Sequence, residues 1–397
     1  MKIDTNEKKI EELLTRSVEE ILPSKKELRE VLMSGKRLRI YIGTDATGTS
    51  LHLGHATNYI ILEKFRKLGH EVIFLIGDFT SRIGDPTDKS DTARKQLTRE
   101  DVMQNTKTWI NQVKPVIDVD NTENPIRILF NHDWLAQLTF EDIINLASNF
   151  TVQQMIERDM FQKRMESGKP LYLHELFYPL MQGYDSVAMD VDIEMCGMDQ
   201  KFNALAGRTL LKKLKNKEKF VFITTLLENP TTGEKMMSKS LGTGVFLDFN
   251  EVKMYGAIMA QADENMRQLF VDCTSCSFDE IQTILSAENP RDAKMQLAFK
   301  ITQTYHGDKK AECAQKQFIE TFQKGIAPDD VVEIKPVYIE SLLTAEIIMS
   351  KTELRRLLEA GGVKDAETGE KLFEIPDHVD TPRVLKIGKR RFVKLVP

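Results

Sequence analysis

LRIYIGTDATGTSLHLGHATN, residues 38–58, runs from an apolar stretch through a polar segment into the start of a helical pattern. The apolar stretch, Leu38–Gly43, is short and continuous, which is typical of a strand buried on both faces. The helical pattern extends over His55–Leu68. A buried strand that leads into a helix is the repeating unit of a parallel α/β sheet.

Four more apolar runs continue this alternation. The further strands that we expect are Val72–Ile76, Ile126–Phe130, Val191–Cys196 and Phe220–Thr225, with a long helical pattern over Phe140–Arg164. Such alternation predicts an α/β fold with a Rossmann-like, doubly wound parallel sheet. We place this first domain, including an N-terminal helix, in residues 1–245.

Two different patterns follow the first domain. The pattern is helical throughout from about Glu251 to Gly325, which predicts an all-α second domain over residues 246–325. Ile326–Val337 is acidic and carries two prolines, as linkers often do. Residues 338–397 form a small third module, for which we expect an α+β fold. A chain of 397 residues exceeds the usual size of one compact core, which agrees with several domains.

Composition excludes several classes of protein. The formal net charge of −5 rules out a globally basic protein that coats nucleic acid, so RNA contact would need a local basic patch. Four cysteines are too few for a disulfide scaffold and favour a reducing compartment. Cys273 and Cys276 have CxxC spacing without a second pair, which indicates packed thiols rather than a zinc site. No apolar run resembles a signal peptide or could span a bilayer, so we expect a cytoplasmic protein without membrane contact.

Clusters of polar, glycine or histidine residues follow each of the five predicted strands. Because ligands bind beyond the carboxyl ends of strands in open parallel sheets, these clusters predict a binding site. The clusters are Thr44–Asn58, Gly77–Lys89, Asn131–Trp134, Gly197–Asn203 and Gly233–Gly244.

The first cluster brings two histidines to the start of a helix. His52 and His55 are three residues apart, which puts both rings on one face of the first turn. Gly54 leaves room for a ligand to approach the backbone. Free N–H groups attract phosphate to a helix N-terminus, and imidazoles can donate hydrogen bonds to its oxygens. The alternative is one capping histidine and one core histidine.

The fifth cluster contains MMSKS, residues 236–240, between two glycines. Lys239 can reach a phosphate as a flexible point charge. The alternative is an ordinary solvated lysine turn. The histidine pair and the MMSKS segment occur in this order, each after a predicted strand. This combination is much rarer by chance than either segment alone.

The segments around these signals resemble a known family. SLHLGH at 50–55 and MSKS at 237–240 are similar to the two signatures of class I aminoacyl-tRNA synthetases. The motif from Tyr41 to His55 resembles that of the tyrosyl-tRNA synthetases in particular. So do IGDP at 83–86, YPLMQGYD at 178–185 and GMDQ at 197–200.

The resemblance extends from about residue 39 to the C-terminus. Residues 350–364 and 386–394 look like the S4-type RNA-binding domain that many bacterial members carry. The chain departs from the family at Met236, where a lysine is usual and Lys235 comes one place earlier. It also departs at Ala46, where a proline is usual.

The resemblance implies which residues bind tyrosine. A selective site must hydrogen-bond the phenolic hydroxyl, because buried partners left unpaired reject phenylalanine, an effect for which this family is the standard example. The residues assigned to that hydroxyl are Tyr41 and Asp185. Those assigned to the substrate ammonium are Asp85, Tyr178 and Gln182, with Thr80 and Gln200 nearby.

The spacing of three of these residues supports a buried site. Tyr178, Gln182 and Asp185 are spaced i, i+4 and i+7, which puts them on one helix face. Their neighbours are apolar, so we expect the helix to be buried on several sides and its polar groups to need partners. The alternative is a polar stripe that faces solvent.

The resemblance also implies the mechanism. The tyrosine carboxylate would attack the α-phosphate of ATP, pyrophosphate would leave, and a terminal ribose hydroxyl of tRNA would attack the tyrosyl-adenylate. Magnesium is expected as the ATP counter-ion, with no structural metal held by the protein. The residues implied at the triphosphate are Thr47, His52, His55, Lys239, Lys235 and Lys89. The others implied at ATP are Asp45, Gly54, Asn58, Gly197, Asp199, Met237, Ser238 and Ser240.

The RNA partner that the resemblance implies is tRNA(Tyr), and a homodimer is expected. Residues 246–325 would be the anticodon-binding domain. Arg383–Lys394 is rich in basic residues, contains no acid and interleaves apolar residues, which favours a folded strand pair over a loose basic tail. The expected RNA-binding residues are Arg355, Arg356, Lys386, Lys389, Arg390 and Arg391.

Two other hypotheses compete with this one. A tryptophanyl-tRNA synthetase or a small HxGH nucleotidyltransferase would share the architecture, but Tyr41 with Asp185 argues against the former, and the MSKS loop with the basic module against the latter. A non-catalytic RNA-binding relative would also share the fold. The intact residues that argue against lost chemistry are His52, His55, Asp85, Asp199 and Lys239.

Overall fold

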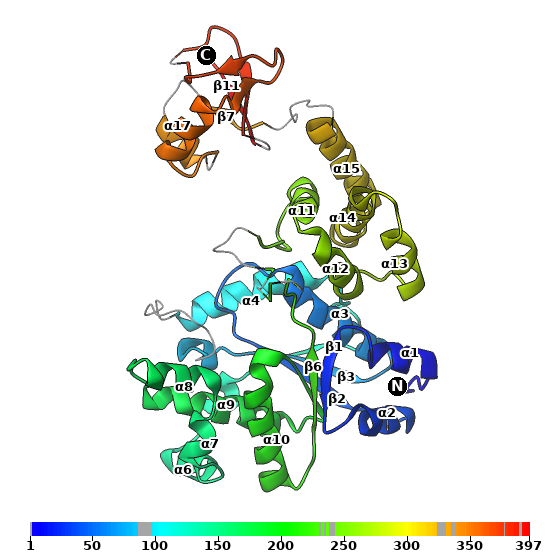
Figure 1. Cartoon of the computed structure of the whole chain (residues 1–397). Coiled ribbons are helices and arrows are strands. Elements are labelled where there is room, and N and C mark those ends of the chain that lie inside the picture. The colour runs from blue at the N-terminus through cyan, green and yellow to red at the C-terminus, as the bar shows by residue number, and fades with distance from the viewer. Residues whose placement is uncertain are drawn as a thin grey trace. The chain divides into compact units, whose positions relative to one another are not determined.

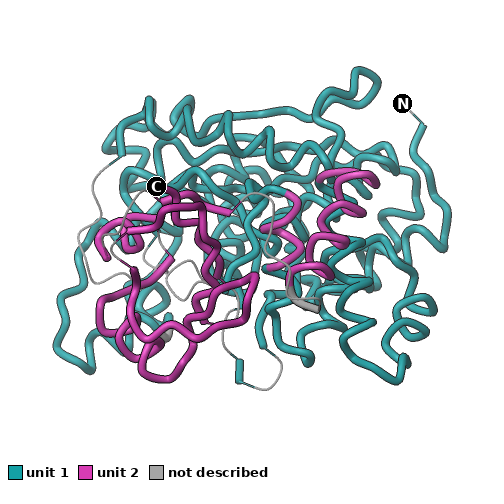
Figure 2. Tube along the Cα trace, turned by 90° about the horizontal axis from the view of Figure 1, so that it is seen from above, with its two compact units in different colours: residues 1–250, 257–305 teal, residues 251–256, 306–397 magenta. Residues whose placement is uncertain are grey.

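The computed structural model describes residues 2–85, 97–229, 232–233, 236–237, 243–323, 331–334, 339–345, 347–376, 378–388 and 391–397. Figure 2 shows the two compact units into which the chain divides. Unit 1 comprises residues 1–250 and 257–305, and unit 2 comprises residues 251–256 and 306–397. The division into catalytic, anticodon-binding and S4-like domains stays a prediction.

Unit 1 is built on a six-stranded sheet with the order β1-β6-β5-β2-β3-β4. The strands are β1 (Val18–Leu22), β2 (Arg39–Thr44), β3 (Glu71–Ile76), β4 (Arg127–Phe130), β5 (Ile193–Gly197) and β6 (Phe220–Thr224). β2 to β6 pair in parallel, as the apolar runs predicted. The expected doubly wound α/β fold is therefore confirmed.

β1 was not predicted, and it pairs with β6 in the antiparallel sense at the edge of the sheet. Its sequence, VEEIL, contains one buried residue, Ile21. Two glutamates interrupt this sequence, so β1 lacks the continuous apolar run by which the five parallel strands were recognised, including β4 at the other edge of the sheet.

Helices flank the strands of unit 1 (Figure 1). α3 packs against β2 and β3, and α10 packs against β5 and β6. The helices up to residue 215 are α1 (Glu7–Leu13), α2 (Lys25–Met33), α3 (Leu53–Lys67), α4 (Arg99–Val113), α5 (His132–Leu135), α6 (Phe140–Ala147), α7 (Val152–Ile156), α8 (Asp159–Glu166), α9 (Leu173–Met189) and α10 (Lys201–Lys215). Two 3-10 turns, η1 (Thr80–Arg82) and η2 (Met198–Gln200), follow β3 and β5.

The single helical pattern expected over Phe140–Arg164 is wrong, because this segment forms three short helices, α6, α7 and α8. The Thr151 hydroxyl caps the start of α7 by accepting a hydrogen bond from the Gln154 N–H at 3.2 Å. Arg158 then has extended backbone before α8. Capping residues restart a helix without disturbing the apolar period, so the pattern did not show the breaks.

The chain after residue 250 is helical up to residue 323, as predicted. The elements are α11 (Glu251–Met259), η3 (Asp263–Asn265), α12 (Met266–Cys273), α13 (Phe278–Leu285), α14 (Pro290–His306) and α15 (Asp308–Gln323). Within unit 1, the buried Arg16 holds the end of α12 by donating to the carbonyl oxygens of Val271 at 2.8 Å and Thr274 at 2.7 Å.

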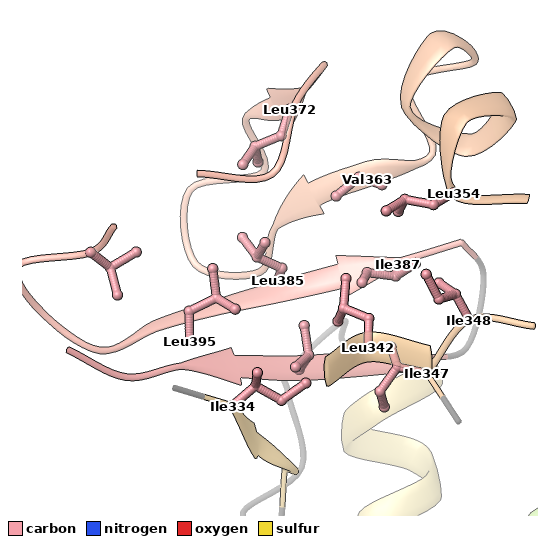
Figure 3. Close-up of a cluster of buried hydrophobic side chains, with 12 residues drawn as sticks. Ile334, Leu342, Ile347, Ile348, Leu354, Val363, Leu372, Leu385, Ile387 and Leu395 are labelled. Carbon is pink, nitrogen blue, oxygen red and sulfur yellow. The ribbon is translucent and has the colours of Figure 1, made fainter. Parts of the chain in front are cut away.

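Unit 2 ends in a small α+β module. Its sheet has the order β7-β11-β10-β8-β9, formed by β7 (Glu333–Ile334), β8 (Val363–Asp365), β9 (Lys371–Leu372), β10 (Arg383–Ile387) and β11 (Arg391–Leu395). Two helices, α16 (Ile339–Thr344) and α17 (Lys351–Glu359), complete it. Figure 3 shows its apolar core, in which Leu342 and Leu354 from the helices face Leu385 and Ile387 of β10. The expected strand pair is β10 with β11.

None of the helices in the described part of the chain combines the length and the apolar character that crossing a bilayer requires.

A buried histidine predicts how stability depends on pH. His70 is buried, its Nδ1 accepts the Leu38 N–H at 3.2 Å, and burial lowers its pKa from 6.5 to about 4. Between these two values the unfolded chain binds a proton that the folded chain does not, so stability falls as the pH is lowered. We expect His70 to account for a loss of about 2 kcal/mol between pH 7 and pH 5.

His70→Asn keeps an acceptor for the Leu38 N–H but does not titrate. Urea unfolding at pH 7 and pH 5 should show a smaller pH-dependent loss in this variant than in the unmodified chain. Equal losses in the two proteins would contradict the assignment.

Candidate active site at the carboxyl edge of the sheet

The carboxylate of Asp45, directly after β2, joins three segments of unit 1. Its Oδ1 accepts from the Thr80 hydroxyl at 2.7 Å, and its Oδ2 accepts from the Tyr178 hydroxyl at 2.9 Å. A Cβ atom at Gly77 would overlap the Asp45 carboxylate. Glycine is therefore required after β3 if this carboxylate is to lie against the backbone.

Asp185 of α9 is a carboxyl group held in the interior. It is 2% exposed, its Oδ1 accepts from the Trp134 indole at 2.7 Å, and its Oδ2 accepts from the Asn131 amide at 3.4 Å. Burial raises its pKa well above the usual range, although these two donors oppose the shift. Asn131 also donates to the Thr80 hydroxyl at 3.1 Å, which links this carboxyl to the Asp45 cluster.

Tyr41 of β2 is 1% exposed, and its hydroxyl lies 3.0 Å from the Ser186 hydroxyl. Burial raises the pKa of Tyr41 well above its usual range, and the nearby carboxylates of Glu194 and Asp185 raise it further. Tyr41 therefore keeps its proton at neutral pH. The structure brings together the two residues predicted to bind a phenolic hydroxyl.

A row of amide side chains connects the other predicted binding residues. The Gln200 amide donates to Asp85 at 2.7 Å. The Asn203 amide donates to Gln200 at 2.9 Å and to Gln182 at 3.0 Å. Asn203 is fully buried, so this row fixes the orientation of both glutamines. The sequence placed Asn203 at the end of the polar cluster after β5 but assigned it no role of its own.

The two histidines begin α3 with their rings stacked, 3.7 Å between centroids. The backbone N–H of His52 donates to Nδ1 of His55 at 3.2 Å. Burial and, to a smaller extent, the neighbouring His52 lower the pKa of His55 to about 3. His55 is therefore neutral near pH 7, and because its Nδ1 accepts a hydrogen bond, its proton resides on Nε2.

α4 supports the loop that carries the histidines, although its sequence carried no signal that predicted this role. The Gln112 side chain accepts from the Leu51 N–H at 2.8 Å and donates to the Thr49 carbonyl at 2.7 Å. The Asn105 amide donates to the Ala46 carbonyl at 2.8 Å. Two buried amide side chains thus fix the loop between β2 and α3.

Arg158 was also missed by sequence reasoning. It is 7% exposed and lies between aromatic rings, 5.3 Å from the Phe161 centroid and 5.2 Å from that of Phe202. Burial lowers its pKa, while the nearby Asp85, Tyr178 and Asp199 raise it. Within the described residues its Nη1 lacks a hydrogen-bond partner.

Only some of the remaining predicted ATP-site residues lie in the described part of the chain. Asn58 accepts from the Thr224 hydroxyl at 2.8 Å, and the Thr47 N–H donates to the Asp45 carbonyl at 2.8 Å. Met237 is buried, and so is Met236, which stands where the family usually has a lysine. The residues that lie outside the described part of the chain are Lys89, Lys235, Ser238, Lys239 and Ser240.

Metal-binding side chains do not cluster in the described residues: these contain no group of three or more His, Cys, Asp or Glu that could hold an ion. Cys273 and Cys276 are buried free thiols.

The basic residues of unit 2 have different environments. Arg355 and Arg356 are exposed on α17. Arg391 anchors the module internally, because it donates to the Ile347 carbonyl and to Glu353, both at 2.8 Å. Lys386 lies over the Phe392 ring at 5.4 Å. Lys389 and Arg390 lie outside the described residues.

Comparison with known proteins gives consistent results. The family model "tRNA synthetases class I (W and Y)" matches residues 33–323. The chain is 40% identical over 406 residues to a tyrosine–tRNA ligase of Carboxydothermus hydrogenoformans, covering 97% of each chain. It is also 40% identical over 391 residues to that of Haemophilus influenzae, covering 96% of this chain and 95% of the relative.

Two solved structures share the fold. A C-terminally truncated mitochondrial tyrosyl-tRNA synthetase from Aspergillus nidulans has a TM-score of 0.65 at 22% identity, covering 79% of this chain and 94% of that one. A tyrosyl-tRNA synthetase from Archaeoglobus fulgidus, complexed with L-tyrosine, has a TM-score of 0.60 at 18% identity, covering 78% and 99%.

Proposed function

Because the chain belongs to the class I tRNA synthetases of the W and Y group, we propose that the carboxyl edge of the unit 1 sheet activates tyrosine with ATP and transfers it to tRNA. The activity is that of a tyrosine–tRNA ligase, the name carried by relatives 40% identical over nearly the whole chain. The observation that supports tyrosine over tryptophan is the burial of Tyr41 and Asp185 at neighbouring positions.

In the proposed tyrosine site, the substrate hydroxyl accepts from Tyr41 and donates to Asp185. The phenol then has both hydrogen bonds that a buried hydroxyl needs, and phenylalanine would leave both partners unpaired. The substrate ammonium lies among Asp85, Tyr178 and Gln182. Their orientation is supported by the bonds from Gln200 to Asp85 and from Tyr178 to Asp45. Thr80 supports Asp45 in the same way.

The proposed ATP site lies at the start of α3. His55 donates from Nε2–H to a phosphate oxygen, since its neutral ring has Nδ1 occupied by the His52 N–H. His52, Thr47 and Gly54 are proposed to contact the same phosphates. The residues proposed for the rest of the nucleotide are Asp45, Asn58, Gly197, Asp199 and Met237, with Lys89, Lys235, Ser238, Lys239 and Ser240 at the pyrophosphate.

The chemistry proposed for this site needs no protein nucleophile. The tyrosine carboxylate attacks the α-phosphorus and the bond to pyrophosphate breaks. A terminal ribose hydroxyl of tRNA then attacks the tyrosyl carbonyl and AMP leaves. Positioning and neutralisation of phosphate charge supply the catalysis. Magnesium accompanies ATP as its counter-ion.

Pyrophosphate exchange with each of the twenty amino acids tests this function. We expect ATP–pyrophosphate exchange with tyrosine alone. Exchange with tryptophan instead would show the other member of the W and Y group, and exchange with none would show a non-catalytic relative. His55→Ala should slow tyrosine-dependent exchange about 100-fold, because one donor to the developing charge is removed. Tyrosine affinity, measured by equilibrium dialysis, should stay within about twofold, and equal losses in both would contradict the role of His55.

We also propose that the small α+β module of unit 2 binds tRNA(Tyr), with residues 246–325 as the anticodon-binding domain. The support is the exposure of Arg355 and Arg356 on α17. Lys386, Lys389 and Arg390 are proposed as further phosphate contacts, whereas the bonds of Arg391 to Ile347 and Glu353 suit it to holding the module together.

Reversal of two exposed charges tests the RNA surface. Arg355→Glu with Arg356→Glu should weaken tRNA binding at least about tenfold and reduce its salt dependence, because phosphate contacts are lost. Tyrosine-dependent pyrophosphate exchange, which needs no tRNA, should not change. Lys351→Glu, elsewhere on α17, is the control for charge alone. Unchanged tRNA affinity in the double variant would exclude this face.

We propose a homodimer as the assembled state. Six of the thirteen exposed large apolar side chains in the described residues lie within one stretch of unit 1, from 140 to 173. Large apolar side chains left exposed along one segment suit a protein contact. These residues are Phe140, Ile144, Val152, Met165, Tyr172 and Leu173.

Light scattering tests the assembly. The unmodified chain should have the mass of a dimer, and Phe140→Asp with Leu173→Asp should have that of a monomer, because charges would be buried at the interface. Phe373→Asp, on an equally exposed residue of unit 2, should leave the dimer intact. A monomeric unmodified chain would refute the proposal.

The compartment proposed for the protein is the cytoplasm. All four cysteines are free thiols, and three of them are buried, which suits a reducing environment.

A further inference from the structure

A buried ion pair lies directly behind the proposed tyrosine site. The side chains of Lys219, which precedes β6, and Glu194 of β5 form a salt bridge and are 0% and 2% exposed. Replacing such a pair by apolar residues is often neutral or stabilising, so stability alone gives little reason for its presence. The mechanism described above does not use either residue.

The pair contacts both ends of the proposed tyrosine site. Nζ of Lys219 donates to the Ser186 hydroxyl at 2.7 Å, and that hydroxyl lies 3.0 Å from the Tyr41 hydroxyl. Oε1 of Glu194 accepts from the Gln182 amide at 3.0 Å. The pair reaches Tyr41, which is proposed for the substrate hydroxyl, through Ser186. It contacts Gln182, which is proposed for the substrate ammonium, directly.

The chemistry of an ammonium group fixes the direction of these hydrogen bonds. Lys219 can only donate, so the oxygen of Ser186 accepts from it. The Ser186 hydroxyl donates to the Glu194 carboxylate at 3.3 Å and lies 3.0 Å from the Tyr41 hydroxyl. A side-chain hydrogen bond also joins Tyr41 to Glu194. The position of the Tyr41 hydroxyl therefore depends on both members of the ion pair.

We propose that Lys219 and Glu194, acting through Ser186, are positioning residues that hold the Tyr41 hydroxyl where it meets the phenolic oxygen of tyrosine. Asp185 accepts a hydrogen bond from the substrate hydroxyl at the same place. Without the ion pair and Ser186, the Tyr41 hydroxyl would lose the partners that fix its position. This inference rests on the proposed tyrosine specificity and names residues that set it.

Two glycines at the contact between two helices leave space for the Lys219 side chain. Figure 1 shows α9 and α10 side by side, and Gly183 and Gly207 face each other between them. A Cβ atom at Gly207 would lie 2.5 Å from Nζ of Lys219 and 3.0 Å from Oγ of Ser186. Gly207→Ala would therefore displace the end of a flexible side chain without removing a polar atom.

Three variants separate positioning from folding. Ser186→Ala removes the intermediate hydroxyl. Lys219→Met with Glu194→Gln removes both charges together, so that no buried charge is left unpaired. Gly207→Ala displaces the ammonium. Lys217→Met is the matched control, because Lys217 forms an ion pair with Asp192 at 3.2 Å, two residues from Lys219 and without contact to Ser186.

The measurement is kcat/KM for pyrophosphate exchange with tyrosine and with phenylalanine, made on the full-length chain. In each of the three variants we expect the tyrosine value to fall about tenfold and the phenylalanine value to stay within twofold, because only tyrosine carries the hydroxyl that Tyr41 meets. The preference for tyrosine would thus fall about tenfold, while Lys217→Met would retain it. A purely structural role would lower both values equally.

An unchanged preference in Ser186→Ala or in the double variant overturns the proposal while leaving the proposed function intact. A chain that shows no tyrosine-dependent exchange before any substitution overturns the function and the positioning role together.

Discussion

The parallel pairing of β2 with both β3 and β5 is the constraint on which the site depends. β2 aligns Thr44 with Ile76 of β3 and Ile42 with Met195 of β5, so the three strands end at one edge. The chain proceeds from β2 outward through β3 and β4, then returns to the other side of β2 for β5 and β6. Helices leave on opposite faces at such a reversal, and ligands bind there in open α/β sheets.

The polar side chains at this edge form hydrogen bonds with one another. Asp45 accepts from Thr80 and Tyr178, Asp185 accepts from Trp134 and Asn131, and Asn203 bonds two glutamines. Each buried group left unpaired would cost about 1–3 kcal/mol, so the network must be nearly complete before a substrate arrives. A preformed network of this kind orients tyrosine and ATP at little cost in ordering the protein.

The same burial has electrostatic consequences for the chemistry. Burial lowers the pKa of His55 to about 3, and it raises the pKa of both Tyr41 and Asp185 above their usual ranges. A neutral imidazole and a protonated phenol each keep one proton to donate at neutral pH. The site can therefore recognise a phosphate and a phenol with donors whose protonation does not change over the physiological range.

By itself the sequence determined the five parallel strands, the alternation of strands and helices, and the polar residues that follow each strand, because apolar runs and glycine-rich strand ends are local signals. It did not reveal β1, the breaks between α6, α7 and α8, or the roles of Asn105, Gln112, Arg158, Asn203 and Lys219. Those depend on partners far apart in the chain, such as Gln112 with Leu51 and Lys219 with Ser186. A buried polar residue looks the same in a sequence whether it supports a loop, a substrate or nothing, and only the tertiary structure decides which partner it meets.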